Sequence, residues 1–326
     1  MYYQDTVYGQ INIGDPVLIE LMETKAMRRL HNILQHGITG FLGITHPVTR
    51  FEHSVGTMIL ARHFKASLQE QIAALLHDVS HTAFSHVTDH VFGTPTGESY
   101  HEVMKESYLK NSDIPKTLAN HGFDWRDFID DTKYPILEQS APALCADRID
   151  YFFRDSLSLG ILSHEEVEYI LSHLLIVNNQ IVADDIIAAR VLADRYMSAD
   201  EKSWSDLQAI GLYELMARII RRGVDINLIS EMDVWQTDIE LWNQLNKTTD
   251  SYLKRQISKL SAALRFEENL IDPLFEVTPR IRTIDPMVLV HGQLIPLSSS
   301  DPAYKSLRDD YLRRKQKTLS LRIVRC

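Results

Sequence analysis

The chain has 326 residues, of which 44% are apolar and 24% charged, and its formal net charge is −10 at pH 7. This composition excludes disordered and fibrous proteins, and the length predicts one large core with appendages or about two domains. The negative charge argues against long nucleic acid as a partner, because a phosphate polyanion attracts basic surfaces.

The first half of the chain is predicted to be helical. A first helix should begin at Pro16, after the capping residue Asp15, and end at Gly37, because proline is favoured in the first helical turn and glycine after the last. Apolar residues recur every three or four positions along it, so one of its faces should be buried. The same periodicity predicts helices over 51–68, 71–77, 100–109 and 135–159, and the sequence TPTGES predicts a turn over 94–99.

The second half combines helical patterns with short strands. Two β-branched runs flank Asn178-Asn179, which predicts a small hairpin over 175–183. Helical patterns return over 184–223 and 234–264, and the residues after 264 mix proline with β-rich segments. We therefore expect a mostly α fold with a further helical region and a small C-terminal α+β part.

The C-terminal stretch 301–326 is locally basic, with eight basic and three acidic residues. A charge run of this kind is usually a solvated face or an oligomer contact, and a site for a phosphate ligand is the alternative interpretation. We expect a homo-oligomer.

The chain shows no secretory or membrane-spanning pattern. Its N-terminus lacks a basic region followed by an apolar one, and no run of 18 apolar residues occurs. Its two cysteines, Cys145 and Cys326, form neither a disulfide framework nor a zinc motif. We therefore expect a cytoplasmic protein with no membrane partner.

Histidines are concentrated in one part of the chain. Ten of the 14 histidines fall between His31 and His101. Imidazole is the commonest neutral ligand for first-row transition metals, and it titrates near physiological pH. The concentration therefore predicts a metal site, acid-base chemistry, or both.

The pair His77-Asp78 follows directly after the apolar run 72–76. A charged group at the end of a buried helix is costly unless it is paired or bound to a metal. A second imidazole, His53, precedes this pair, and a second carboxylate, Asp147, follows it far along the chain. Three helices could bring these four side chains to one divalent ion and leave positions open for water and substrate, as in catalytic sites.

This order of residues resembles the signature of the HD-domain metal-dependent phosphohydrolases: a His, a later His-Asp pair and a distant Asp. The segments 49–56 (TRFEHSVG), 75–86 (LLHDVSHTAFSH) and 147–155 (DRIDYFFRD) are similar to those of the HD-type deoxynucleoside triphosphate triphosphohydrolases (dNTPases). Residues 28–37 resemble the segment that precedes them in that group. The resemblance covers roughly residues 20–160.

The resemblance implies an HD-domain core, which we place at 1–175, and leaves 176–326 as a second region packed on it. It implies one divalent metal ion (Mn, Fe, Mg, Zn or Ni) and a small nucleotide as substrate. The metal ligands that it implies are His53, His77, Asp78 and Asp147. The catalytic set that it implies is His81, His86, Asp89 and His101, and the substrate-binding set is Gln35, Arg50, Arg148, Tyr151 and Asp155.

The implied substrate roles agree with the chemistry of the side chains. Arg50 and Arg148 carry permanent, bidentate charges that suit a phosphate. Tyr151 could stack under a ribose, and Asp155 could accept a hydrogen bond from a 3′-hydroxyl. The sequence departs from the family pattern at Ser80 and 82–83, where glycine and proline are common, and at Arg148, where lysine is usual.

Several of these residues also have an ordinary structural interpretation. His81 would share a face with His77 on a continuous helix and could be a packing residue. His86 and Asp89 could cap a helix end, His101 could occupy an ordinary first-turn position, and Arg50 could form a surface salt bridge. No function is predicted for His31, His36, His46, His63 or His90.

The resemblance predicts an enzyme that hydrolyses a dNTP to the deoxynucleoside and inorganic triphosphate. A phosphomonoesterase or phosphodiesterase that acts on another nucleotide with the same site is one alternative. A second is a two-metal site in which His81, His86 and His101 supply additional ligands. A third, from a different class, is a catalytically silent nucleotide-binding or scaffolding protein.

Overall fold

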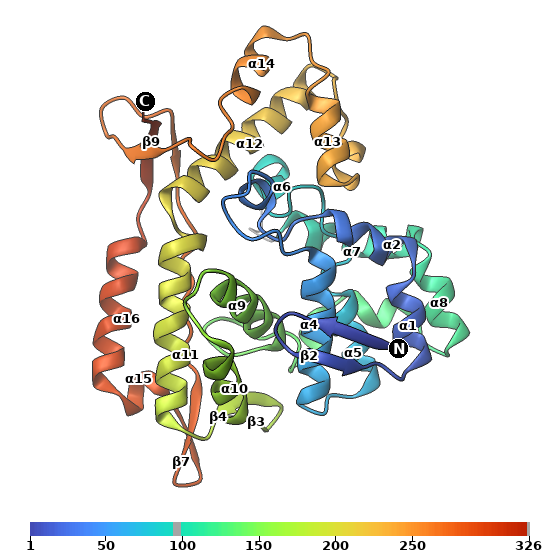
Figure 1. Cartoon of the computed structure of the whole chain (residues 1–326), viewed down its shortest axis with the longest axis vertical. Helices are drawn as coiled ribbons and strands as arrows, with labels where there is room; N and C mark the ends of the chain where they lie inside the picture. The colour runs from blue at the N-terminus through green and yellow to red at the C-terminus, as the bar shows by residue number, and fades with distance from the viewer. Residues whose placement is uncertain (94–98, 325–326) are drawn as a thin grey trace.

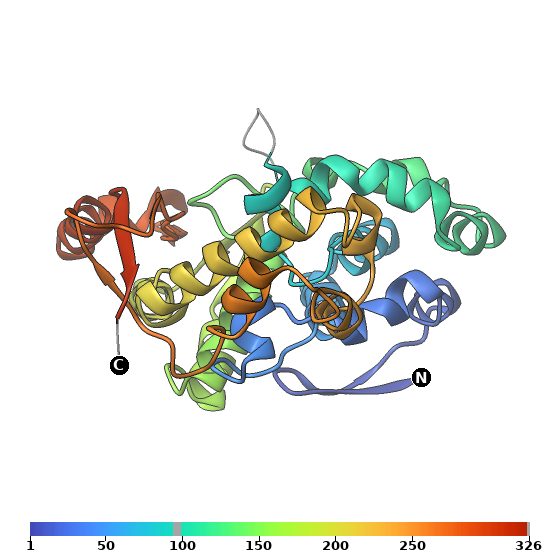
Figure 2. The same ribbon diagram turned by 90° about the horizontal axis from the view of Figure 1, so that it is seen from above.

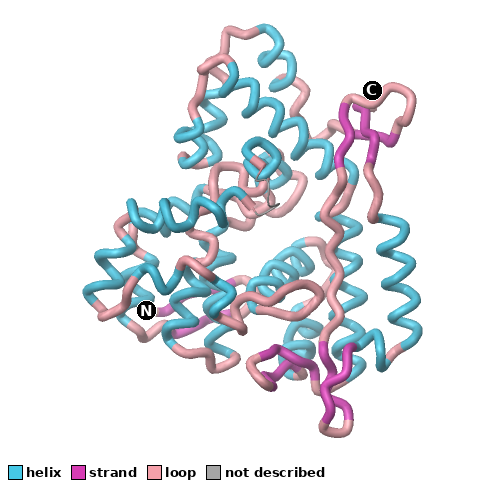
Figure 3. Tube along the Cα trace, turned by 180° about the vertical axis from the view of Figure 1, so that it is seen from behind, coloured by secondary structure: helices cyan, strands magenta, loops and turns pink. Residues whose placement is uncertain are grey.

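The computed structural model describes residues 1–93 and 99–324, so the turn predicted over 94–99 lies almost wholly outside the described residues. Helices make up most of the described chain (Figure 1). Within it the strands form three small sheets at the periphery (Figure 3). The predicted mostly α fold with a C-terminal α+β part is confirmed.

The N-terminal half opens with an antiparallel hairpin of β1 (Tyr2–Asp5) and β2 (Gly9–Asn12). The hairpin and the C-terminal helix α16 lie on opposite sides of the molecule (Figure 2). The helices of this half are α1 (Pro16–Met22), α2 (Lys25–Arg29), α3 (Gly37–Phe41), α4 (Arg50–His63), α5 (Leu68–Leu76), α6 (Val87–Phe92), α7 (Tyr100–Asn111), α8 (Ile114–Asn120) and α9 (Ala146–Ser158).

The C-terminal half combines long helices with two of the three sheets. One sheet has the strand order β3-β4-β7-β8 and the other β5-β9-β6. The helices are α10 (His164–Ser172), α11 (Ile186–Ala199), α12 (Leu207–Asp225), α13 (Asp238–Leu245), α14 (Ser251–Ile257), α15 (Leu297–Ser300) and α16 (Pro302–Lys315). The strands are β3 (Leu174–Val177), β4 (Gln180–Ala183), β5 (Phe266–Glu268), β6 (Phe275–Val277), β7 (Met287–Val290), β8 (Gln293–Pro296) and β9 (Leu319–Ile323).

Three neighbouring helices carry the His and Asp motifs. α4 begins with a capping box, because the backbone N–H of Thr49 donates to Glu52 and that of Glu52 donates to Thr49 Oγ1. α5 is apolar and buried from Ile72 to Leu76, and both α5 and α9 pack against α4 (Figure 1). The buried contacts of α5 and α9 with α4 fix the three helices relative to one another.

The predicted helix over 15–37 is wrong as a single element. Its apolar face is buried as expected, but the helix ends at Met22, and Thr24 starts α2 by accepting a hydrogen bond from the backbone N–H of Met27 at 3.3 Å. A threonine hydroxyl favours such a cap over a helix interior. The pattern over 234–264 is interrupted in the same way, because Asp250 caps α14 through the N–H of Leu253 at 2.7 Å.

The predicted helix over 135–159 begins only at Ala146. The backbone N–H groups of Ile136 and Leu137 donate to the buried Glu70 carboxylate at 2.7 and 3.3 Å. These bonds tie the segment before α9 to α5 and hold it in a loop. Apolar periodicity does not reveal such a competing partner, and the prediction is therefore too long at its start.

The predicted hairpin at Asn178-Asn179 is confirmed. β3 and β4 pair in an antiparallel register around these two residues, with Val177 opposite Gln180. Both asparagines have positive φ angles, 52° and 60°. A two-residue hairpin turn requires this conformation, and asparagine tolerates it better than most residues.

In the described part of the chain, no helix has both the length and the apolar character to cross a bilayer. The largest buried apolar cluster combines residues of the first half, such as Leu76, with residues of the second, such as Tyr196 and Tyr304. The division into 1–175 and 176–326 stays a prediction.

Replacing Gly211 by alanine should destabilise the packing of α12 on β5. A Cβ atom at this position would lie 2.3 Å from Cδ2 of Phe266, whose ring fills the adjacent space. Overpacking of this kind costs about 1–3 kcal/mol. Urea unfolding of Gly211→Ala, compared with Gly14→Ala, where nothing lies within 4 Å of the added atom, measures the difference. Equal stability of the two variants would show that the ring moves aside freely.

Candidate metal centre and active-site cavity

A cavity of about 1070 Å³ lies between α4, α5 and α9 and segments of the C-terminal half. Its wall includes part of α11, the start of α12, the loop after β6 and one side of α16. All residues that the sequence pointed to as ligands, catalytic groups or substrate contacts line this one cavity. They are Gln35, Arg50, His53, His77, Asp78, His81, His86, Asp89, His101, Asp147, Arg148, Tyr151 and Asp155.

Two imidazoles and two carboxylates converge on one wall. His53 Nε2, from α4, lies 2.9 Å from Asp147 Oδ1 on α9 and 3.2 Å from His77 Nε2 at the end of α5. His77 Nε2 lies 3.5 Å from Asp147 Oδ1. Carboxylate oxygens of Asp78 lie 3.6 Å from each of the two imidazole nitrogens. Residues from three separate segments thus meet at one place.

This donor set fits a divalent transition metal. Atoms that are all 2.0–2.2 Å from one ion lie about 3 Å from one another, which is close to the observed spacings. Imidazole and carboxylate together suit Mn, Fe, Zn or Ni better than an alkaline-earth ion. The Asp147 side chain is 24% exposed, so the cluster faces the cavity and has room for further ligands.

The carboxylates of the cluster attract positive charge. Burial opposes protonation of His53, but its hydrogen bonds to Asp147 and Asp150 outweigh burial and raise its pKa to about 10. Burial alone would raise the pKa of Asp78, yet the Arg50 guanidinium beside it holds that pKa well below its usual range. Electrostatics at this wall therefore favour a cation.

A buried network orients His53 from behind. Its Nδ1 lies 2.7 Å from Oδ2 of Asp150, which also accepts hydrogen bonds from Arg154 at 2.7 Å and, through Oδ1, from the Tyr8 hydroxyl at 2.8 Å. Arg154 also donates to Asp5 at 2.8 Å. A carboxylate on the second imidazole nitrogen fixes the tautomer and raises the basicity of a metal-binding histidine. The N-terminal hairpin supplies two members of this network.

A second group of imidazoles borders the first cluster. The rings of His81 and His101 stack with centroids 3.6 Å apart, and the His86 ring lies 4.9 Å from that of His81. His81 Nε2 lies 3.2 Å from Asp78 Oδ1. Asp89 accepts a hydrogen bond from His86 Nδ1 at 2.9 Å. The four residues predicted as the catalytic set therefore lie together, beside the four predicted ligands.

The surroundings of these imidazoles differ. Burial and the charge of Arg50 lower the pKa of His81, and burial together with the imidazoles of His81 and His86 lowers the pKa of His101. The packing interpretation of His81 assumed a helix that continues past His77, but α5 ends at Leu76. His86 occupies the N-cap position before α6, but its side chain accepts no capping hydrogen bond. Its side chain instead pairs with Asp89 and stays 34% exposed to the cavity side.

The two predicted phosphate-binding arginines are already engaged by the protein. Arg50 is buried and donates to Asp78 at 2.6 Å, to the Ser85 hydroxyl and to the backbone of Gln35. It therefore holds a predicted ligand in place and is not a residue of a surface salt bridge. Arg148 donates to the backbone oxygen of Ala143 at 2.6 Å and supports the loop before α9.

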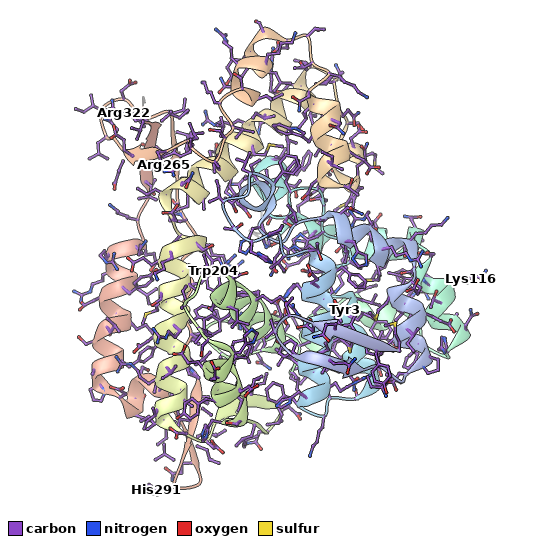
Figure 4. The ribbon with its side chains drawn as sticks, viewed as in Figure 1. Tyr3, Lys116, Trp204, Arg265, His291 and Arg322 are labelled. Atoms are coloured by element: carbon purple, nitrogen blue, oxygen red, sulfur yellow. The ribbon has the colours of Figure 1, made fainter. Side chains whose placement is uncertain are left out.

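The predicted sugar contacts form a polar and aromatic corner. Asp155 accepts a hydrogen bond from the indole N–H of Trp204 at 2.7 Å, and its other oxygen lies 2.8 Å from His36 Nε2. The Tyr151 ring packs edge-on against Trp204 and hydrogen-bonds with Tyr196. Figure 4 shows Trp204 near the end of α11. It belongs to a π-helical turn, Asp200–Trp204, a conformation often found at functional sites.

Sequence reasoning did not find several residues of this wall. It gave His36 no function and did not single out Trp204 or Tyr196. No local sequence motif marks these residues, because only tertiary contacts bring them to Tyr151 and Asp155. The buried Lys105 donates to Asp131 at 2.6 Å within the same wall. Only the hydrophobic context of a buried lysine could have drawn attention to it. Three arginines of the C-terminal half were also missed: Arg280, Arg282 and Arg308.

Comparison with known proteins identifies the family. The HD domain model matches residues 50–155. The chain is 38% identical to "Metal-dependent phosphohydrolase cns2" of Cordyceps militaris, over 95% of this chain and 91% of that protein. It is 25% identical to the deoxynucleoside triphosphate triphosphohydrolase SAMHD1 of Danio rerio, over 52% of this chain and 35% of that protein.

Among solved structures, a phosphohydrolase from Bacteroides thetaiotaomicron superimposes with a TM-score of 0.76 over 98% of each chain, at 17% identity. That likeness shows a shared fold over the whole length. Family membership is shown instead by the match to the HD domain model and by the similarity to the relative from Cordyceps militaris. The chain belongs to the HD-domain family of metal-dependent phosphohydrolases.

Proposed function

We propose that this protein uses one divalent metal ion to hydrolyse a deoxynucleoside triphosphate to the deoxynucleoside and inorganic triphosphate. The observation that carries the proposal is the convergence of two imidazoles and two carboxylates on the wall of a cavity of about 1070 Å³. This volume is just above the usual range of about 300–1,000 Å³ for small-molecule sites, so a whole nucleotide would fit. The similarity to a dNTPase over half of the chain supports the substrate class.

His53, His77, Asp78 and Asp147 would hold the ion. When bound, such an ion polarises a phosphate oxygen and supplies a water of lowered pKa at neutral pH. By binding Nδ1, Asp150 would leave Nε2 of His53 available as the ligand atom. Arg50 binds Asp78 and lines the cavity, where an N–H group that these bonds leave over would bind an oxygen of the reacting phosphate.

The pair of His86 and Asp89 is the best placed source of a proton for the leaving oxygen. Asp89 accepts from Nδ1 of His86, so a proton on Nε2 would face away from the carboxylate. His81 and His101 are more deeply buried, and their lowered pKa values make them hydrogen-bonding partners of the phosphate rather than the acid.

Replacing His101 by alanine should reduce turnover and leave the metal bound. His101 contacts His81 and lies outside the four proposed ligands, and loss of a positioned acid-base or hydrogen-bonding group costs typically about 10²–10⁴-fold in rate. Metal content by plasma mass spectrometry and initial rates on the same preparation test this. Loss of the metal together with activity would instead make His101 a ligand, as a two-metal site requires.

Tyr151 and Asp155 would contact the sugar. The Tyr151 ring lies 6.4 Å from that of His53, so a sugar attached to a phosphate at the metal would reach it. Asp155 is held by Trp204 and His36, but a carboxylate has about four acceptor positions, and two remain for a hydroxyl. The corner thus has a rigid aromatic face and a fixed acceptor.

The activity is tested with protein supplied with Mn²⁺ and a panel of NTPs, dNTPs and nucleoside monophosphates, with products identified by mass. The expected products from a dNTP are the deoxynucleoside and inorganic triphosphate. Release of orthophosphate from a monophosphate, with no cleavage of dNTPs, would contradict the proposal and favour a phosphomonoesterase. Binding of dNTPs without any turnover would favour the silent nucleotide-binding protein.

A further inference from the structure

The cationic side chains that line the cavity fall into two groups. The first group lies near the metal cluster and is paired with acidic residues. Arg50 donates to Asp78, and Lys105 donates to Asp131, in both cases at 2.6 Å. Arg148 lies near the acidic Glu138 and binds backbone oxygens. The protein itself neutralises most of the charge of this group.

The second group consists of Arg280, Arg282 and Arg308. Within residues 1–93 and 99–324, no carboxylate oxygen lies within 4.0 Å of any of their guanidinium nitrogens. Arg308 donates to the Thr283 hydroxyl at 3.1 Å. In the same described residues, the Arg282 guanidinium donates no hydrogen bond to a protein atom. Three positive charges therefore lie at one edge of the cavity without a carboxylate of the described residues in ion-pair contact.

This edge is formed by the C-terminal half alone. Arg280 and Arg282 lie in the loop between β6 and β7, and Arg308 lies on α16. None of them falls in the segment 50–155 that matches the HD domain. The edge thus lies outside the HD domain match. Through Arg308 it includes part of the basic stretch 301–326, for which a phosphate ligand was the alternative interpretation.

Arg282 is the member of the group that lies nearest the proposed reaction site. Its Cζ atom lies 5.4 Å from the ring centroid of Trp204 and 5.7 Å from that of Tyr151. Its backbone N–H donates to Asp200 at 3.3 Å, which fastens the loop to the π-helical turn. The Tyr151 ring adjoins both His53 and Arg282. A ligand that extends from the metal cluster past Tyr151 would meet this guanidinium.

We propose that Arg282, assisted by Arg280 and Arg308, binds the phosphates of the substrate that are not attacked. A half-buried guanidinium without a carboxylate is costly to keep, and its planar fork matches the oxygens of a phosphate. A polyphosphate carries enough negative charge for both the metal wall and the arginine edge, whereas a single phosphate at the metal leaves the edge empty. The edge would therefore select triphosphates over monophosphates. The proposed subsite rests on the proposed function. It makes the phosphates that are not attacked the part of the substrate that the C-terminal half would bind.

The test uses the full chain loaded with Mn²⁺ and isothermal titration with two probes, inorganic triphosphate and orthophosphate. Arg282→Gln should weaken triphosphate binding by about 10- to 100-fold, the equivalent of one charged hydrogen-bonding contact, and change orthophosphate binding little. Arg282→Lys should restore part of the loss. Arg255→Gln, which removes an exposed charge from α14, is the matched control and should bind both probes like the wild type.

Arg280→Gln provides a second variant, because Arg280 is exposed and its loss does not disturb the aromatic corner. It should also weaken triphosphate selectively. Unchanged triphosphate binding in both variants would overturn the subsite, and so would an equal loss of both probes, which would indicate a structural role. A subsite that binds triphosphate selectively in a protein that cleaves no dNTP would instead refute the proposed function alone.

Discussion

His77→Ala should abolish turnover and lower the affinity for the metal by more than about 100-fold. Loss of a residue that merely supports a ligand typically costs about 10- to 100-fold in metal affinity, so loss of a ligand should exceed that range. His77 Nε2 lies within 3.6 Å of His53, Asp78 and Asp147 donors, and no other described histidine ring occupies its place. Titration with Mn²⁺ and rates on the nucleotide panel measure both effects.

The matched control is His63→Ala. His63 is an exposed histidine in the last turn of α4, and its removal should change neither metal affinity nor rate. Full activity of His77→Ala at saturating Mn²⁺ would contradict the assignment of the ligands. Loss of activity with a full complement of metal would move His77 from the ligand set to the catalytic set.

Arg154→Met should destabilise the protein by about 3–5 kcal/mol, the usual cost of removing one partner from a buried ion pair. Asp5 and Asp150 are both buried and would lose the cation that they share. The space is shaped for this residue, because a Cβ atom on Gly56 would lie 1.8 Å from Arg154 Nη2. Since Asp150 holds His53, we also expect weaker binding of Mn²⁺.

Urea unfolding of the metal-free protein gives the stability change, and titration with Mn²⁺ gives the second effect. Arg126→Met is the matched control: it breaks an exposed pair with Asp124, and such pairs contribute at most about 1 kcal/mol. Equal stability of Arg154→Met and Arg126→Met would contradict a stabilising role of this buried ion pair.

The sequence was sufficient to identify the candidate site because its chemistry is encoded locally. His77 and Asp78 are adjacent, and each remaining ligand lies in a short segment that resembles a family motif. The asparagine pair of the hairpin is encoded in the same way, since two positions with positive φ need only a suitable local sequence. Features of this kind require no knowledge of distant residues.

The features that the sequence did not reveal depend on contacts across the fold. The helix predicted over 135–159 starts late because Glu70, far away in the chain, takes its backbone donors. Arg282 and Trp204 carry no recognisable motif, and only the tertiary structure brings them beside Tyr151. The structure also gives Asp155 two protein partners that a role inferred from resemblance alone does not include.

Trp204 is the last residue of the π-helical turn Asp200–Trp204. The direction of its indole therefore depends on the number of residues between α11 and Trp204. In an α-helix each residue advances about 100° around the axis, so deleting a single residue before Trp204 would rotate the indole out of the corner and release Asp155. The corner of Tyr151, Asp155 and Trp204, where we propose that the sugar binds, should therefore tolerate many side-chain exchanges along α11 but no change in spacing. An insertion or deletion at this junction would change the corner around Asp155 and leave the four proposed metal ligands in place. Relatives could acquire different substrate preferences in this way.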